Sequence, residues 1–255
     1  MIGETSLLRR LYRQFYWGVV SPLLDVWRIR SRTIGYPGGA RLIWTVQPYT
    51  MVGLPRLLNA FDLARRVESQ GIKGAMVECG VFKGGCVGLM AKVSADARSG
   101  RKVWLFDSFE GLPEPTALDG TLAEEYAARE AAGKLVPIDR CVGLIETVEE
   151  LLFEKLRLDR GNIVLRKGWF QETLPVAKTE VGEIALLRLD GDWYESTKVC
   201  LENLYDLVVQ GGFVIIDDYG YWEGCRRATD EFLAGRGLTL PLERIDDTGV
   251  FFVKP

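Results

Sequence analysis

Histidine is absent from this sequence of 255 residues, and its absence removes several kinds of chemistry at once. A chain without histidine cannot form Ser-His-Asp or Cys-His catalytic groups, and it cannot hold a metal through imidazole ligands. Any metal bound here would be held by oxygen ligands, which suit Mg²⁺, Ca²⁺ and Mn²⁺.

The sequence also has few cysteines and no long apolar run. Its five cysteines form neither a CxxC pair nor a zinc spacing, which is typical of reduced thiols in a cytoplasmic protein. The apolar stretch 15–27 is too short to span a membrane, and no small-residue cleavage site follows it, so we expect no signal peptide. A net charge of −3 lacks the basic excess of a general nucleic-acid binder, and we expect no nucleic-acid partner.

The first part of the chain is basic and aromatic. Residues 1–56 contain eight arginines against Glu4 and Asp25, a net charge of +6. We predict that residues 1–47 form a helical arm that packs on the main domain or on a second subunit, which favours a homodimer. Contact with a membrane surface is the less favoured alternative for the same segment.

From residue 55 onward the sequence alternates between helical and strand patterns. Apolar residues at helical spacing predict helices over 55–70, 122–131, 145–158, 198–210 and 225–237. Short apolar runs predict strands over 74–80, 102–108, 162–168, 182–190, 211–218 and 249–255. The alternation predicts an α/β domain over 48–255, with a mostly parallel twisted sheet and helices on both faces. In such sheets, ligands bind at the carboxyl ends of the strands.

A glycine-rich turn, VECGVFKGG at 77–85, joins the first predicted strand to the following helix. Glycine allows tight turning and close approach of a ligand, but the spacing is neither GxGxxG nor a P-loop. Glu78 precedes the glycines and would repel a phosphate, whereas it suits a cationic ligand such as S-adenosylmethionine (SAM). The alternative is a plain tight turn without a ligand.

Two further strand ends carry candidate cofactor contacts. Asp107 ends the second strand, where an acid can accept hydrogen bonds from a ribose diol; a helix cap or a turn residue is the alternative. Trp169 and Phe170 follow Gly168 after the third strand and could stack on an adenine, although ordinary core aromatics are equally compatible with the pattern.

Carboxylates gather at the ends of the fourth and fifth strands. Asp190 follows one apolar run, and Asp217 and Asp218 follow the next. Burying a carboxylate is costly unless it is paired or binds a cation, and the sequence shows no evident basic partner for these three. We therefore predict that they hold a divalent cation, whereas Asp192 and Glu195 cap the following helix.

Six segments of the sequence resemble the macrocin O-methyltransferase (TylF-type) family: VECGVFKGG, VWLFDSFEGLP, KGWFQETLP, LLRLDGDWYEST, LYDLVVQGGFVIIDDYG and GCRRATDEF. They occur in order from about Thr50 to the C-terminus. The resemblance implies a Rossmann-like class I methyltransferase fold and a SAM-dependent enzyme that uses Mg²⁺, or Mn²⁺, to methylate a hydroxyl of a small molecule. Because the family methylates sugar hydroxyls on antibiotics, a sugar hydroxyl of a natural product or glycan is the expected acceptor.

The resemblance also implies roles for individual residues. The expected SAM contacts are Thr50, Met51, Glu78, Gly80, Gly84, Asp107, Ser108, Gly168, Trp169, Phe170 and Asp190. The expected metal ligands are Asp190, Asp217 and Asp218, with Asp190 also acting as the general base. Residues 109–140 are the expected acceptor lid. Three other functions stay open at this point: a nicotinamide-dependent oxidoreductase, a non-catalytic SAM- or nucleoside-binding module, and a membrane-surface scaffold that depends on the N-terminal arm.

Overall fold

The computed structural model describes residues 20–128 and 131–255. Two compact units divide the chain between Thr45 and Val46, two residues before the boundary that the sequence predicts. No helix in those described stretches is long and apolar enough to cross a membrane.

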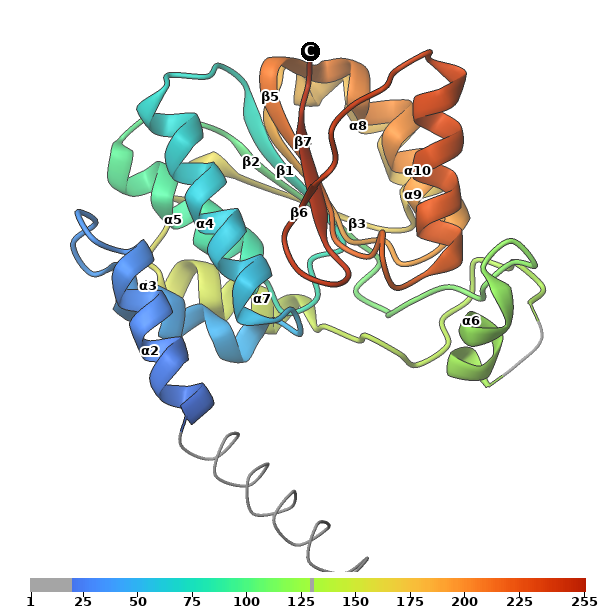
Figure 1. The fold of residues 1–255 in the computed structure, drawn as a ribbon, viewed down its shortest axis with the longest axis horizontal. Helices are drawn as coiled ribbons and strands as arrows, with labels where there is room; N and C mark the ends of the chain where they lie inside the picture. The colour runs from blue at the N-terminus through green and yellow to red at the C-terminus, as the bar shows by residue number, and fades with distance from the viewer. Residues whose placement is uncertain (1–19, 129–130) are drawn as a thin grey trace, which may run out of the picture. The chain divides into compact units, whose positions relative to one another are not determined.

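Helices make up most of the described part of the first unit (Figure 1). α2 spans Ser21–Arg32, and α3 spans Gly39–Val46. Pro22 lies in the first turn of α2, where its fixed φ favours the start of a helix. Most of residues 20–45 of the predicted arm is therefore helical, and residues 1–19 of it lie outside the described residues.

A seven-stranded sheet forms the centre of the second unit, with the strand order β3-β2-β1-β4-β5-β7-β6. The parallel strands are β1 (Ala75–Cys79), β2 (Val103–Asp107), β3 (Ile163–Lys167), β4 (Ile184–Leu189) and β5 (Val208–Ile216). β7 (Val250–Val253) pairs antiparallel with β5, and the short β6 (Glu243–Arg244) pairs antiparallel with β7. The predicted mostly parallel sheet is confirmed, and its strand order reverses between β1 and β4, where such sheets bind their ligands.

Helices cover both faces of this sheet (Figure 1). One face carries α4 (Leu54–Ser69) and α5 (Gly85–Ala97), and the other carries α8 (Phe170–Val181), α9 (Tyr194–Leu204) and α10 (Glu223–Gly235). The remaining helical elements of this unit are η2 (Gln47–Tyr49), α6 (Gly120–Ala127), α7 (Ile145–Glu149), the π-helical η3 (Glu150–Lys155), η4 (Arg160–Asn162) and η5 (Tyr205–Leu207). Because both faces are covered, every residue of β1 and β4 is buried.

The structure departs from the predicted helices at α9 and at α8. The sequence predicts one helix over 198–210, but α9 ends at Leu204 and β5 already begins at Val208, a β-branched residue that favours a strand. Residues 171–181 carry no predicted element, yet they belong to α8. Pro175 lies inside this helix and obscures its helical pattern, because proline usually ends a helix.

Glycine lets several segments approach the turn between β1 and α5. Gly80 has a φ of +88°, and a Cβ at this position would overlap the backbone carbonyl of Asp190 at the end of β4. At Gly85, a Cβ would lie 2.7 Å from the Cβ of Thr50. These two glycines therefore allow the end of β4 and the segment around Thr50 to lie against the predicted cofactor turn.

We expect Gly80→Ala to lower the free energy of unfolding by about 3–5 kcal/mol, because the new methyl group adds a backbone clash to the strain of a positive φ. Gly71→Ala is the matched control: Gly71 also has a positive φ, +64°, but a Cβ there would meet open space. The control should lose only about 1 kcal/mol. Urea unfolding measures both losses. Equal losses in the two variants would show that the close contact between the turn after β1 and the end of β4 does not require glycine at position 80.

Candidate active site

A cleft of about 980 Å³, part of it open to solvent, lies at the carboxyl ends of the central parallel strands. All predicted SAM contacts except Gly84 line it: Thr50, Met51, Glu78, Gly80, Asp107, Ser108, Gly168, Trp169, Phe170 and Asp190. Gly84 is the N-cap residue of α5, with a φ of +89°, and does not contribute to the lining. The fold thus gathers segments that are distant in sequence around one space.

Asp107 holds the turn between β1 and α5 in place. Its Oδ2 accepts hydrogen bonds from the backbone N–H groups of Val81 (2.6 Å) and Phe82 (2.9 Å), and its Oδ1 accepts one from Phe109 (2.7 Å). Burial raises the pKa of Asp107, and these three hydrogen bonds act in the opposite direction. A carboxylate can accept about four hydrogen bonds, so Asp107 retains capacity for a ligand hydroxyl while it serves as a turn residue.

The loops after β2 and β3 form the next part of the wall. The Ser108 hydroxyl donates to the carbonyl of Gly111 (2.7 Å), which stabilises the turn after β2. Gly168 has a φ of +139°, and its N–H donates to the backbone carbonyl of Asp107 (2.9 Å). Trp169 follows as the N-cap residue of α8 and lines the cleft, where an aromatic side chain can stack on a planar ligand.

Arg188 lies on β4 with only 2% of its surface exposed, and it connects three strand ends. Its Nη1 donates to Glu78 at β1 and to Oδ2 of Asp190 (2.9 Å), and its Nη2 donates to Asp217 after β5. A buried guanidinium is tolerated only when it is paired, and here three carboxylates pair with it. Arg188 therefore determines how these three carboxylates are arranged.

The expectation that the predicted metal ligands lack a basic partner is wrong. Asp217 is paired on both sides, because Oδ1 accepts from Arg188 and Oδ2 accepts from Arg56 of α4. Arg56 also forms an ion pair with Asp246 (3.1 Å) and lies 4.0 Å from Asp218. Asp217 is thus occupied by arginines, although it lines the cleft as predicted.

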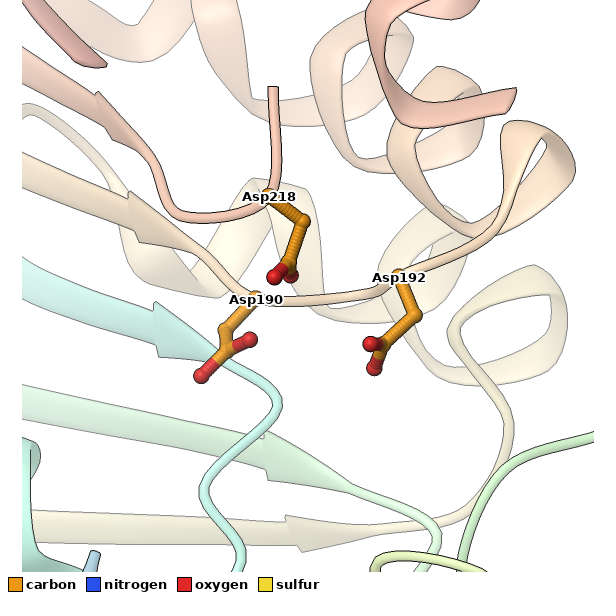
Figure 2. A group of neighbouring side chains, drawn as sticks. All are labelled: Asp190, Asp192 and Asp218. Carbon is orange, nitrogen blue, oxygen red and sulfur yellow. The ribbon is translucent and has the colours of Figure 1, made fainter. Parts of the chain in front are cut away.

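Three other carboxylates share a space at the ends of β4 and β5. Figure 2 shows Asp190, Asp192 and Asp218 with their carboxylates close together, and one oxygen of each lies within 4.8 Å of the others. The sequence predicted the set Asp190, Asp217 and Asp218. Among the described residues, the structure joins Asp190 and Asp218 with Asp192 and directs Asp217 toward the two arginines.

Asp192 does not cap α9, so that prediction is also wrong. The N-cap residue of α9 is Trp193, and its side chain makes no capping hydrogen bond. The Oδ1 of Asp192 instead accepts a hydrogen bond from Nε1 of Trp222 (2.6 Å), which directs this carboxylate into the cleft. Glu195, the other predicted cap, lies in the first turn of α9, where a negative charge is favourable.

Burial raises the pKa of most carboxyl groups in the cleft. Desolvation raises the pKa of Asp217 to about 6, of Asp192 to about 7 and of Glu78 to about 8, although arginines oppose the shift at Asp217 and Glu78. The pKa of Asp218 is also raised, first by burial and then by the neighbouring charges of Asp192 and Asp190. The cleft therefore favours an added positive charge or added protons.

Two buried oxygens in the cleft have no hydrogen-bond partner among the described residues. They are Oε2 of Glu78 and Oδ2 of Asp218. Buried polar atoms without a partner are uncommon, and at a functional site they mark positions where a ligand or ion can bind. Glu78 offers its oxygen on the side of the predicted cofactor turn, and Asp218 offers its oxygen within the carboxylate group of Figure 2.

The segment 109–140 is anchored beside the acidic residues. Asp119 is completely buried, and its Oδ1 accepts a hydrogen bond from the backbone N–H of Tyr194 at the start of α9. The indole Nε1 of Trp193 donates to the carbonyl of Pro113 (2.9 Å). Through Gly111, Leu112 and Pro113 the segment lines the cleft, as expected for a covering segment, and its role as a lid remains a prediction.

Several lining residues were not identified from the sequence, above all Arg188, Arg56 and Cys141. The sequence does contain a signal for Arg188, because a charged residue inside a run of otherwise buried strand residues must be paired within the protein. Arg56 lies on an ordinary amphipathic helix, and Cys141 lies in an irregular loop, so no local pattern distinguishes either residue.

The sheet order, the helices on both faces and the cleft at the strand ends define a Rossmann-like class I methyltransferase. Residues 40–254 match the family described as Macrocin-O-methyltransferase (TylF). The chain belongs to this family and is a SAM-dependent O-methyltransferase. The oxidoreductase and the non-catalytic binding module are not supported by the comparisons.

Relatives with assigned activities agree with this class. The chain is 39% identical over 211 residues to 8-demethyl-8-(2,3-dimethoxy-alpha-L-rhamnosyl)-tetracenomycin-C 4'-O-methyltransferase of Streptomyces olivaceus, covering 82% of this chain and 77% of the relative. It is 34% identical to demethyldecarbamoylnovobiocin O-methyltransferase of Streptomyces niveus, with the same coverage. The solved structure of the O-methyltransferase NovP superposes with a TM-score of 0.71 at 33% identity, covering 81% of this chain and 82% of NovP.

The raised pKa values predict that the metal-free protein loses stability as the pH rises. Asp217, Asp192 and Glu78 bind protons more tightly in the folded chain than in the unfolded chain, so folding is favoured at low pH and less favoured as these groups ionise. We expect the free energy of unfolding in EDTA to fall from pH 5 to pH 8. No histidine contributes in this range, and Asp192→Asn should flatten the profile. A free energy of unfolding that stays constant or rises over this pH range would contradict the raised pKa values.

Proposed function

We propose that this SAM-dependent enzyme methylates a sugar hydroxyl of a natural product or glycan and that a divalent cation, Mg²⁺ or Mn²⁺, assists the transfer. The observation that carries the proposal is the group of Asp190, Asp192 and Asp218 beside the cofactor cleft. Two relatives support the acceptor class by their names, the tetracenomycin rhamnosyl 4'-O-methyltransferase and mycinamicin III 3''-O-methyltransferase.

The residues of the cleft fit the cationic methyl donor. Glu78 has a buried oxygen without a hydrogen-bond partner in the described structure, which suits the ammonium group of the methionine part of SAM. Asp107 retains acceptor capacity for a ribose hydroxyl. Trp169 and Phe170 line the cleft after β3 and would stack on the adenine. These assignments follow the contacts that the sequence predicts.

The acidic residues fit a hard divalent cation. Asp190 and Asp218 would act as ligands, because both belong to the group of converging oxygens and Asp218 has an oxygen without a partner among the residues described. Asp217, the third predicted ligand, would have to exchange an arginine for the cation, whereas Asp192 would not. A cation bound there would lower the pKa of the acceptor hydroxyl and hold it in place.

Asp190 is the residue we assign as general base. Its side chain is 25% exposed and is held on one side by Arg188 at 2.9 Å, so it can reach an acceptor in the cleft while keeping its orientation. The acceptor oxygen would give its proton to Asp190 and attack the sulfonium methyl group, and the C–S bond would break to release S-adenosylhomocysteine. Holding the two reactants in line would supply much of the acceleration.

The remaining assignments concern the whole protein. We propose a small-molecule acceptor covered by the segment 109–140, because Gly111, Leu112 and Pro113 of that segment line the cleft. A cytoplasmic location is consistent with the free thiols of the five cysteines, all of which lie in the described part of the chain. The homodimer remains a prediction.

Asp190→Asn should reduce turnover at least about 100-fold, because the variant lacks the proton acceptor. Binding of S-adenosylhomocysteine, measured by calorimetric titration, should stay within a few-fold of the wild type. The matched control is Asp247→Asn, which removes an equally charged side chain that is fully exposed and outside the cleft. Near-normal turnover of Asp190→Asn on any accepted glycoside would remove this residue from the mechanism.

Binding of Mn²⁺, followed by electron paramagnetic resonance without an acceptor, tests the cation directly. We expect Asp218→Asn to weaken binding at least about tenfold, because it removes a converging oxygen. Comparison of Asp192→Asn with Asp217→Asn then identifies the third ligand. If the wild type binds no Mn²⁺ but still binds S-adenosylhomocysteine, the cation is wrong and the methyltransferase assignment is unaffected.

A further inference from the structure

One face of α2 exposes a stripe of large apolar side chains. Leu23 is 65% exposed, Trp27 is 67% exposed and Leu24 is 37% exposed. Trp27 follows Leu23 by four residues and Leu24 by three, so all three share one face of the helix. Just beyond the helix, Ile34 is 76% exposed. Exposed apolar side chains gathered on one face are typical of a surface that contacts another protein or a membrane.

Arginines border this stripe on both sides. Arg30 follows Trp27 by three residues and Leu23 by seven, which places it along one edge, and Arg28 follows Leu24 by four along the other edge. Both arginines are exposed. Asp25, the acidic residue of the helix, forms an ion pair with Arg28 (3.3 Å) and lies away from the stripe. The face therefore has an apolar centre and cationic borders.

The charge of the chain is distributed in the same way. Residues 1–45 contain seven arginines against Glu4 and Asp25, a net charge of +5, although the whole chain has a net charge of −3. The rest of the chain is therefore clearly negative. An anionic surface would attract residues 1–45 and repel the rest of the chain, so charge favours contact through the part of the chain that contains α2.

We propose that α2 docks the protein on an anionic phospholipid surface. Leu23, Leu24 and Trp27 would enter the boundary between headgroups and acyl chains, where tryptophan is favoured. Arg28 and Arg30 would extend their long side chains to the phosphates on either side. α2 has 12 residues and is too short to span a membrane, so the contact is peripheral.

This docking is separate from methyl transfer. The family match begins at residue 40, after the end of α2, and the residues that line the cleft begin at Thr50. A second copy of the chain is the other occupant that this face could take. An anionic lipid surface is favoured over a second copy, because residues 1–45 carry a net charge of +5 and the same segments of two copies would repel each other.

The test is flotation of the full-length protein with vesicles of phosphatidylcholine alone or with about one third phosphatidylglycerol. We expect binding to the anionic vesicles only. Leu23→Ser/Trp27→Ser and Arg28→Gln/Arg30→Gln should each weaken it at least about tenfold, because each removes apolar or electrostatic attraction. Val176→Ser/Lys178→Gln, which makes the same kinds of change on the exposed face of α8, is the matched control and should bind like the wild type.

Titration with S-adenosylhomocysteine shows that the methyltransferase domain of each variant is folded, because no altered residue lines the cleft. Absence of wild-type binding to anionic vesicles would overturn the proposal, as would unchanged binding of Leu23→Ser/Trp27→Ser. A second outcome would also overturn the proposal: the wild type does not bind vesicles and is a dimer by light scattering, whereas Leu23→Ser/Trp27→Ser is a monomer. The face would then be an interface between two copies of the chain.

Discussion

The buried guanidinium of Arg188 is the interaction on which the arrangement of the cleft depends. β4 is covered on both faces, so a charged side chain within it must find partners inside the protein. Arg188 finds them at the ends of three neighbouring strands, in Glu78, Asp190 and Asp217. Removing one partner of a buried ion pair costs about 3–5 kcal/mol, so these carboxylates and the arginine are held together.

The same interaction divides the acidic residues into two groups. Asp217 lies between Arg188 and Arg56 and is compensated by them, whereas Asp192 and Asp218 have no arginine within hydrogen-bond distance among the described residues. The raised pKa of Asp218 follows from that imbalance as well as from burial. A cationic cosubstrate and a divalent ion would both relieve this excess of negative charge, so one electrostatic feature serves both ligands of the proposed reaction.

The sequence predicted the strand ends and the acidic residues at them, because these depend on local pattern. It did not predict which partner each carboxylate has, because that depends on the direction of the side chains in the fold. Apolar runs followed by Asp190 and by Asp218 predicted neighbouring strand ends, and these two residues do lie together. The pairing of Asp217 with Arg56 joins positions 161 residues apart, and no local pattern encodes it. Asp107 shows a third case: its predicted ribose contact and the alternative turn role are compatible, because one carboxylate has enough acceptor positions for both.

The orientation of Asp192 links the proposed acceptor side of the cleft to the segment 109–140. Asp192 is held by the indole of Trp222, whose ring makes edge contacts with Trp193 (4.9 Å between ring centres) and with Tyr126 of α6 (5.5 Å). The parallel strands direct their carboxyl ends toward α6 (Figure 1). Substitutions in that segment can therefore move Asp192 through the aromatic contacts without touching Arg188. In the proposed reaction, such substitutions would change acceptor preference while Glu78 and Asp190 keep their pairing with Arg188.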